Sequence, residues 1–379
     1  MSKRIVGLDF LRAFAVLSVV YSHAVKYVYD RSMAWYYGFF AFDGVSIFFV
    51  LSGFLIGGIL LAIVNQPTFL LGELFDFWKR RWFRTLPNYL LVLCFVLFAN
   101  VGTSDLAPSL VLRYFTFTQN LTGPHPSFFP EAWSLAVEEW FYLVLPLVLF
   151  LLIKSYSRHR ARLIFMVVIV ALVSLTLFRI QHAAGTVIAD ERDWDRMLRK
   201  VVVFRLDALM LGVLAACVKF HAPRLFFCRP RAMFALGVAL LIIDRAQIFS
   251  PAHLTYLKYV SLSLNPAAAF LMLPWLVQLT TGANPLVRAA TFISAISYSM
   301  YLLNLTPVIH VVMPHLLPAL SIPADLTPMW GAARYALFWL ATIVLSALLH
   351  YLFEKPMTKL REHVSKPEPQ FVYFPTATS

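Results

Sequence analysis

Charged residues are scarce in this sequence: Asp, Glu, Lys and Arg make up only 13% of its 379 residues, whereas 60% are hydrophobic. An ordinary globular domain carries about 25% charged and about 45 to 50% apolar residues. A soluble chain cannot bury that much apolar surface, which excludes an ordinary soluble enzyme. We therefore expect an integral membrane protein.

Cysteine is also scarce, and the three residues present, Cys94, Cys217 and Cys228, lack the spacing of a metal or redox motif. We therefore expect no metal site and no disulfide. The formal net charge is +13, but no polar module gathers base-reading or stacking groups, so we expect no nucleic-acid partner. The basic residues lie between apolar runs, where membrane lipids are the expected partner.

Apolar runs of roughly 20 residues recur along the chain, and each is long enough to cross a hydrocarbon core of about 30 Å. They predict an all-α fold, a polytopic membrane helical bundle of about ten transmembrane helices. The first run is longer than the core of a signal peptide, so we expect it to be retained. The predicted spans are residues 10–28, 38–64, 86–101, 132–153, 163–180, 201–219, 232–249, 259–280, 292–313 and 333–353.

The distribution of Lys and Arg predicts the orientation. With a cytoplasmic N-terminus, 19 of the 32 lie in inside segments and nine in outside segments, as expected when cytoplasmic loops carry the excess of positive charge. We expect a multi-pass protein of the cell inner (cytoplasmic) membrane with both termini in the cytoplasm. Residues 1–362 form the predicted transmembrane domain, and residues 363–379 a polar, disordered cytoplasmic tail. We expect residues 66–85 to form a short interfacial helix at the cytoplasmic face. We expect residues 102–131 to form a long outside loop that acts as a lid or binding surface.

An ionisable group inside a membrane helix costs at least about 2.5 kcal/mol, so it needs a partner or a task. Arg12 and His23 lie eleven positions apart, close to three helical turns, and project from nearly one face. Asp9 lies on the same stripe. A neutral imidazole is the usual general base near pH 7, which makes His23 the predicted base. The alternative is an Asp9–Arg12 ion pair, with His23 hydrogen-bonded to a neighbour.

Ser134, Glu138 and Tyr142 recur at intervals of four and share one face of the fourth predicted span. Glu138 lies at roughly the predicted depth of His23, where a carboxylate would orient the imidazole. The alternative is a packing hydrogen bond between helices. Glu139 points about 100° away and is not expected to face the same partner.

Arg81 and Arg84 lie one turn apart in a basic segment, residues 79–84. Guanidinium groups bind phosphate oxygens in a fork, so the pair predicts a polyphosphate site. The alternative is a topology signal that binds anionic lipid. Tyr298 and Asn304 lie in the ninth predicted span, where hydroxyls and amides also hold helices together.

These segments together resemble the acyltransferase 3 family, bacterial membrane proteins that transfer acetyl or other acyl groups to hydroxyls of glycans and small molecules. The resemblance runs from about Gly7 to Arg361. It rests on six ordered motifs: GLDFLRAFAVLSVVYSH from Gly7, DGVSIFFVLSGFLI from Asp43, RRWFRTLP from Arg80, EAWSLAVEEWFYLVLP from Glu131, ISYSMYLLNLTP from Ile296 and YLFEKP from Tyr351.

The resemblance implies a catalytic His23 and Glu138, a functional Arg12, and Arg81 and Arg84 on the donor side. The substrates are expected to contact a further set as well: Asp9, Asp43, Ser134, Tyr298 and Asn304. Two positions depart from the family pattern, since Trp140 stands where Gln is usual and Asn304 where His is frequent. These departures leave the acceptor open.

The implied reaction is transfer of an acyl group, foremost acetyl, from acyl-CoA to a hydroxyl of a glycan, a lipid-linked saccharide or a small molecule. Acyl-CoA is a co-substrate, and no permanently bound cofactor is expected. His23 would remove the hydroxyl proton while Arg12 or backbone donors stabilise the oxyanion. A transporter or glycan flippase would also carry intramembrane charges. A noncatalytic scaffold is a third possibility, which explains neither His23 nor Glu138.

Overall fold

The computed structural model describes residues 4–25, 38–66, 71–100, 106–155, 160–247, 250–280, 284–323 and 328–364. Within these ranges every regular element is helical, which confirms the predicted all-α class. The elements, with η for 3-10 and π helices, are α1 (Val6–Ala24), α3 (Gly44–Val64), α4 (Leu71–Ala99), α5 (Pro108–Phe115), α6 (Ala132–Ser155), α7 (Arg160–Gly185), α8 (Glu191–Trp194), η3 (Asp195–Arg199), η4 (Val202–Phe204), α9 (Leu206–His221), α10 (Pro223–Phe226), α11 (Pro230–Ala246), α12 (His253–Tyr256), η6 (Leu257–Ser261), α13 (Leu262–Leu276), α14 (Pro285–Leu303), η7 (Asn304–Val312), α15 (Met313–Ala319), α16 (Pro328–Leu349), η8 (His350–Glu354) and α17 (Lys355–Val364).

Among the described residues, eight helical segments are long and apolar enough to cross a membrane, so the protein is multi-pass. The two remaining predicted spans, residues 201–219 and 232–249, correspond to α9 and α11, which have 16 and 17 residues. At 1.5 Å per residue these helices are about 24 to 26 Å long. α9 packs on α3 and α7, and α11 packs on α13. Both therefore belong to the same bundle as the longer helices.

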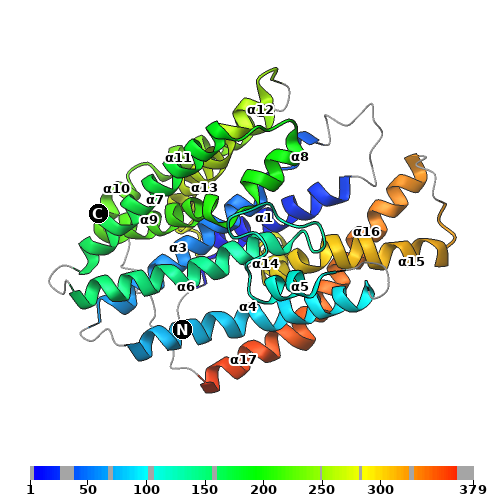
Figure 1. Cartoon of the computed structure of the whole chain (residues 1–379), viewed down its shortest axis with the longest axis horizontal. Coiled ribbons are helices and arrows are strands. Elements are labelled where there is room, and N and C mark those ends of the chain that lie inside the picture. Colours follow the sequence, from blue (N-terminus) through cyan, green and yellow to red (C-terminus); the bar gives the residue numbers. More distant parts are fainter. Residues whose placement is uncertain are drawn as a thin grey trace.

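The interior of the bundle is built around α1 and α3, which lie side by side (Figure 1). A Cβ atom added at Gly53 of α3 would lie 2.0 Å from the carbonyl oxygen of Leu209 in α9. One added at Gly44, the first residue of α3, would lie 2.1 Å from the carbonyl oxygen of Ala15 in α1. Small residues allow membrane helices to approach this closely. The two glycines therefore fix α3 against α9 and α1.

Residues 71–99, taken from the predicted interfacial helix (66–85) and the predicted span (86–101), form one continuous helix, α4. Two separate elements were predicted because residues 66–85 mix aromatic residues with a basic cluster, a pattern typical of an interfacial helix. In the structure Arg80 and Arg81 are only 4% and 6% exposed, so these two side chains face the protein rather than lipid headgroups. Pro87 lies inside the helix. Figure 1 shows α4 and α17 side by side along one edge of the bundle.

The described part of the predicted outside loop, residues 106–131, is packed against α4. The Tyr89 hydroxyl donates a hydrogen bond to the carbonyl oxygen of Tyr114 at 2.8 Å. The Tyr114 hydroxyl in turn accepts one from the backbone N–H of Phe129 at 3.3 Å. Both Tyr114 and Phe129 are fully buried. The loop therefore has a fixed path that leads Glu131 to the start of α6.

Candidate active site

Six of the predicted site residues lie around one cavity of about 110 Å³. We name it the arginine cavity. It lies among α1, α3, α4, α6 and α14, and its lining includes Arg12, Arg81, Arg84, Ser134, Glu138 and Tyr298.

Three guanidinium groups dominate the charge of the arginine cavity. Arg81 is buried and Arg84, one turn later in α4, is exposed. Arg12, from α1, interacts electrostatically with Arg84 and Glu138. Glu138 is the carboxylate among the lining residues, so the cavity carries a net positive charge. Such a site attracts anions, and guanidinium groups pair well with phosphate.

Glu138 is held by two hydroxyl groups, from Ser52 of α3 at 3.0 Å and from Tyr142 at 2.9 Å. Glu139 faces elsewhere and accepts a hydrogen bond from the Thr85 hydroxyl of α4 at 2.6 Å. The prediction that the two adjacent carboxylates have different partners is therefore confirmed. The reason is the rotation of about 100° between successive residues of a helix.

Ser134 and Tyr298 connect the helices around the arginine cavity. The Tyr298 hydroxyl donates to the carbonyl oxygen of Thr85 at 2.7 Å, and the Ser134 hydroxyl donates to the hydroxyl of Tyr301 at 2.6 Å. These bonds tie α14 to both α4 and α6. The two polar groups thus help to hold the cavity walls together.

Asp9 lies outside the lining of this cavity. Its carboxylate pairs with Arg4 at 2.5 Å and accepts a hydrogen bond from the Ser294 hydroxyl of α14 at 2.8 Å. The ion pair between Asp9 and Arg12, which the sequence analysis gave as an alternative, is therefore not formed; Asp9 pairs with Arg4 instead. Asp9 anchors the start of α1 to α14, and its predicted substrate contact stays a prediction.

A second cavity, of about 170 Å³, contains His23 and Asp43. We name it the histidine cavity. It lies between the end of α1, the starts of α3 and α6, and η3, and its lining includes Ser22, His23, Asp43, Glu131, Arg199 and Tyr301.

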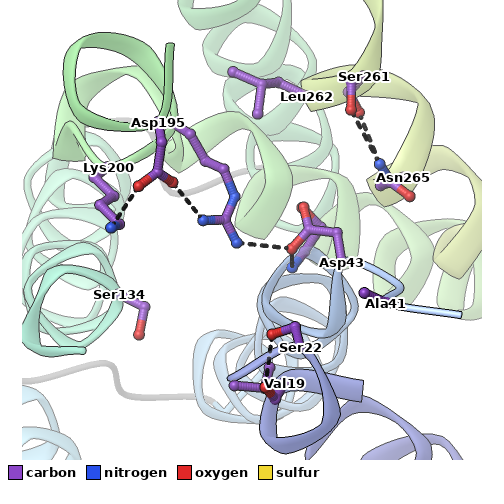
Figure 2. Close-up of polar contacts among 12 residues, drawn as sticks. Val19, Ser22, Ala41, Asp43, Ser134, Asp195, Lys200, Ser261, Leu262 and Asn265 are labelled. Carbon is purple, nitrogen blue, oxygen red and sulfur yellow. Dashed lines mark hydrogen bonds and ion pairs between the residues drawn. The ribbon is translucent and has the colours of Figure 1, made fainter. Parts of the chain in front are cut away.

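An ion-pair network crosses the histidine cavity. Arg199 contacts Asp195 at 2.8 Å and Asp43 at 3.3 Å, and Lys200 contacts Asp195 at 2.5 Å. Figure 2 shows Lys200, Asp195 and Asp43 joined in this chain. Burial alone would raise the pKa of Asp43, but the charges of Arg199 and Arg205 lower it to about 2. The network therefore keeps Asp43 ionised at neutral pH.

Asn304 fixes the orientation of His23. The His23 Nδ1 atom lies 2.5 Å from the Asn304 Oδ1 atom. The Asn304 Nδ2 atom donates to the carbonyl oxygens of Met300 and Tyr301, both at 2.9 Å, so the amide oxygen must be the atom that faces His23. In the neutral ring, Nδ1 then carries the proton and Nε2 the lone pair. Asn304 also begins the π-helical segment η7, and π-helical turns are frequent at functional sites.

The predicted pairing of His23 with Glu138 is wrong. Glu138 lines the arginine cavity, whereas His23 lines the histidine cavity and has Asn304 at its Nδ1 atom. The prediction compared the depth of two residues in their helices, and depth does not determine which helices are neighbours. Of all the lining residues, Val45 and Tyr301 are shared by the two cavities.

Several polar residues that line the histidine cavity were not predicted as site residues. Glu131 accepts hydrogen bonds from the backbone N–H and the hydroxyl of Thr306, at 2.8 and 2.7 Å. In the sequence analysis Arg199 and Lys200 were counted among the basic residues of the outside segments, and no role in a site was predicted for them. The available signal was the spacing of four between Asp195 and Arg199, which on a helix brings opposite charges together and so fits an ion pair better than a solvated loop.

A family model described as an acyltransferase domain, acyltransferase 3, matches residues 5–354. The chain belongs to this family. The match covers every helix that lines the two cavities of this acyltransferase 3 protein. The enzyme class expected from the sequence, an acyltransferase, is confirmed by this membership.

Curated relatives of the acyltransferase 3 protein carry O-acetyltransferase names. O-acetyltransferase OatA of Staphylococcus aureus (strain NCTC 8325 / PS 47) is 32% identical over 194 residues, 46% of this chain and 29% of the relative. The putative peptidoglycan O-acetyltransferase YrhL of Bacillus subtilis (strain 168) is 33% identical over 197 residues, 47% of this chain and 29% of the relative. Peptidoglycan O-acetyltransferase OatA of Listeria monocytogenes serovar 1/2a is 30% identical over 199 residues, 48% of this chain and 30% of the relative. The chain spans less than a third of the length of these relatives. No solved structure matches it.

Proposed function

We propose that this protein is a membrane-bound O-acyltransferase that moves an acetyl group from acetyl-CoA to a hydroxyl of a glycan. One observation carries the proposal: a cationic cavity and a histidine cavity adjoin inside the bundle and share Val45 and Tyr301. The first suits an anionic donor, and the second holds a base among polar side chains. The thioester carbon and the attacking oxygen meet at the shared boundary.

The arginine cavity binds the donor in this proposal. Arg81 and Arg84 lie one turn apart on α4 and hold the phosphates of CoA, because two guanidinium groups grip a polyphosphate from one side. The thin pantetheine arm enters between the helices. Arg12, beside Glu138, stabilises the negative charge that develops on the thioester oxygen.

His23 is the general base. Its Nε2 atom takes the proton from the acceptor hydroxyl as that oxygen forms a bond to the thioester carbon. The tetrahedral intermediate collapses by breaking the carbon–sulfur bond, and the CoA thiolate leaves and takes up the proton from the imidazolium. Asn304 holds the Nδ1–H throughout, so Nε2 is the atom that gains and loses the proton.

The histidine cavity receives the acceptor. Its charges are paired, Asp43 and Asp195 with Arg199 and Lys200, which leaves a polar surface suited to a hydroxyl-rich ligand. Two of the relatives bear the name peptidoglycan O-acetyltransferase, which supports a glycan acceptor. The excess of Lys and Arg in the predicted inside segments supports cytoplasmic termini, with donor binding on the cytoplasmic side.

A transporter or flippase is the second candidate, because two adjoining cavities also describe a path through a bundle. Incubation of purified protein with radiolabelled acetyl-CoA and peptidoglycan fragments or neutral oligosaccharides separates the two. The acyltransferase releases one free CoA thiol for each acetyl group that it transfers. A His315→Gln variant, altered at an exposed histidine, serves as the matched control. Absence of thiol release and of labelled product with every acceptor favours the transporter.

A further inference from the structure

Tyr301 lies where the two cavities adjoin. Its side chain lines both, and Val45 is the other residue among the described lining residues that does so. Tyr301 is 8% exposed and Val45 is 4% exposed. The boundary between the arginine cavity and the histidine cavity therefore contains these two residues, contributed by α14 and α3.

The Tyr301 hydroxyl is held from α6. It accepts a hydrogen bond from the Ser134 hydroxyl at 2.6 Å and donates one to the carbonyl oxygen of Glu131 at 3.1 Å. Both partners lie at the beginning of α6 or directly before it. The two bonds fix the ring at the place where the cavities adjoin. Removal of the hydroxyl alone would loosen the ring without removing its volume.

The proposed function, on which this inference rests, requires donor and acceptor to meet at this boundary. The thioester approaches from the arginine cavity and the hydroxyl from the histidine cavity, so the acyl chain must fit against the boundary residues. We propose that Tyr301 and Val45 determine the acyl-chain length that the protein accepts. They leave room for acetyl and reject longer chains, because a fixed apolar wall discriminates by about 10-fold to 200-fold for each methylene.

The test compares kcat/KM for acetyl-CoA, butyryl-CoA and hexanoyl-CoA in purified variants, with the acceptor that the wild type uses. Val45→Ala removes two methyl groups from the boundary and should raise the butyryl-to-acetyl ratio at least about tenfold. Tyr301→Phe should raise it less, because the ring volume remains. Val50→Ala is the matched control, since Val50 is a fully buried valine of α3 that lines neither cavity.

The outcomes separate this inference from the proposed function. A raised butyryl-to-acetyl ratio in Val45→Ala, with an unchanged ratio in Val50→Ala, supports the proposed role of the boundary residues. If kcat/KM of Val45→Ala falls equally for every donor, while its elution profile and acetyl-CoA binding are unchanged, the chain-length inference is overturned. The proposed acyl transfer is not affected by that result. Equal use of all three donors by the wild type also overturns it. A wild-type protein that releases no CoA from any donor overturns the proposed function as well.

Discussion

The His23 Nδ1 atom lies 2.5 Å from the Asn304 Oδ1 atom, although 281 residues separate them in the sequence. The Asn304 amide nitrogen already donates to two carbonyl oxygens, so its oxygen accepts the Nδ1 proton. In the proposed mechanism Asn304 takes the place of the carboxylate of an acid–base triad, without adding a charge inside the bundle. The basic nitrogen of the neutral ring is Nε2.

Replacement of His23 by Ala should abolish acyl transfer while the protein still folds and binds donor. Loss of a general base lowers the rate by about 100-fold to 10,000-fold, which is about 3 to 5 kcal/mol. The measurement is product formation by the purified variant, with acetyl-CoA affinity determined in parallel. Near wild-type turnover in a variant that binds donor would remove His23 from the mechanism.

Asn304→Leu should slow transfer at least about tenfold, about 1.4 kcal/mol, because the imidazole loses its orienting acceptor. Asn304→Asp keeps an accepting oxygen and should retain more activity than the Leu variant. The check is kcat for both variants beside acetyl-CoA affinity, which should not change. Equal activities in the two variants would mean that Asn304 acts only in packing.

Arg81 and Arg84 should control the use of the donor. Replacement of both by Ala should raise the KM for acetyl-CoA far more than the KM for the acceptor, since phosphate contacts are lost. Replacement of both by Lys should rescue the KM only in part, because an ammonium group lacks the fork geometry. Initial rates at varied donor and acceptor give both constants. If donor kinetics stay the same in the Ala variant, the pair serves membrane topology instead.

Much of the fold follows from the sequence, because apolar length decides which segments can cross a bilayer. The first and last residues of α4 could not be predicted from the sequence. Pro87 and the basic residues before it have the features of a helix boundary, but tertiary packing of Arg80 and Arg81 overrides that local signal. The shortness of α9 and α11 also depends on their neighbours in the bundle.

The arginine cavity was more predictable than the histidine cavity for a physical reason. Helical spacing within one segment determines which residues share a face, as it does for Ser134 and Glu138. The partners of His23 and Asp43 come from distant segments. Asn304 is 281 positions from His23, and Arg199 is 156 positions from Asp43. No local pattern encodes such pairs.

The orientation of the chain can be tested with cysteine substitutions. Ser127 and Asp193 should lie outside and Arg224 inside, as the distribution of Lys and Arg predicts. Arg158 is also expected on the cytoplasmic side, but it is not among the residues that the structure describes. In a background without Cys94, Cys217 and Cys228, an impermeant reagent applied to intact cells should label Ser127→Cys and Asp193→Cys but not Arg224→Cys. Permeabilised cells should label all three, and the reverse pattern in intact cells would invert the topology.

The burial of His125 makes stability depend on pH. His125 lies in the packed loop before α6 and is 3% exposed. Burial, with a smaller effect from the positive charge of Lys200, lowers its pKa to about 3. Its Nε2 atom has no hydrogen-bond partner among the described residues. The ring is therefore neutral in the folded protein at neutral pH.

His125→Phe should remove part of this pH dependence. Below the unfolded pKa of about 6.5 the unfolded chain binds a proton that the folded chain does not, so stability falls as pH falls from about 6.5 toward about 3. Between the two pKa values the loss amounts to about 5 kcal/mol at most. Phe keeps the edge contact that the imidazole makes with the Tyr114 ring, at 6.0 Å between centroids. Thermal unfolding at pH 7.5 and pH 5.0 should therefore show a smaller drop in Tm for His125→Phe than for wild type or for the exposed control His315→Phe. An identical drop in all three would show that His125 is already protonated in the folded state or is not buried.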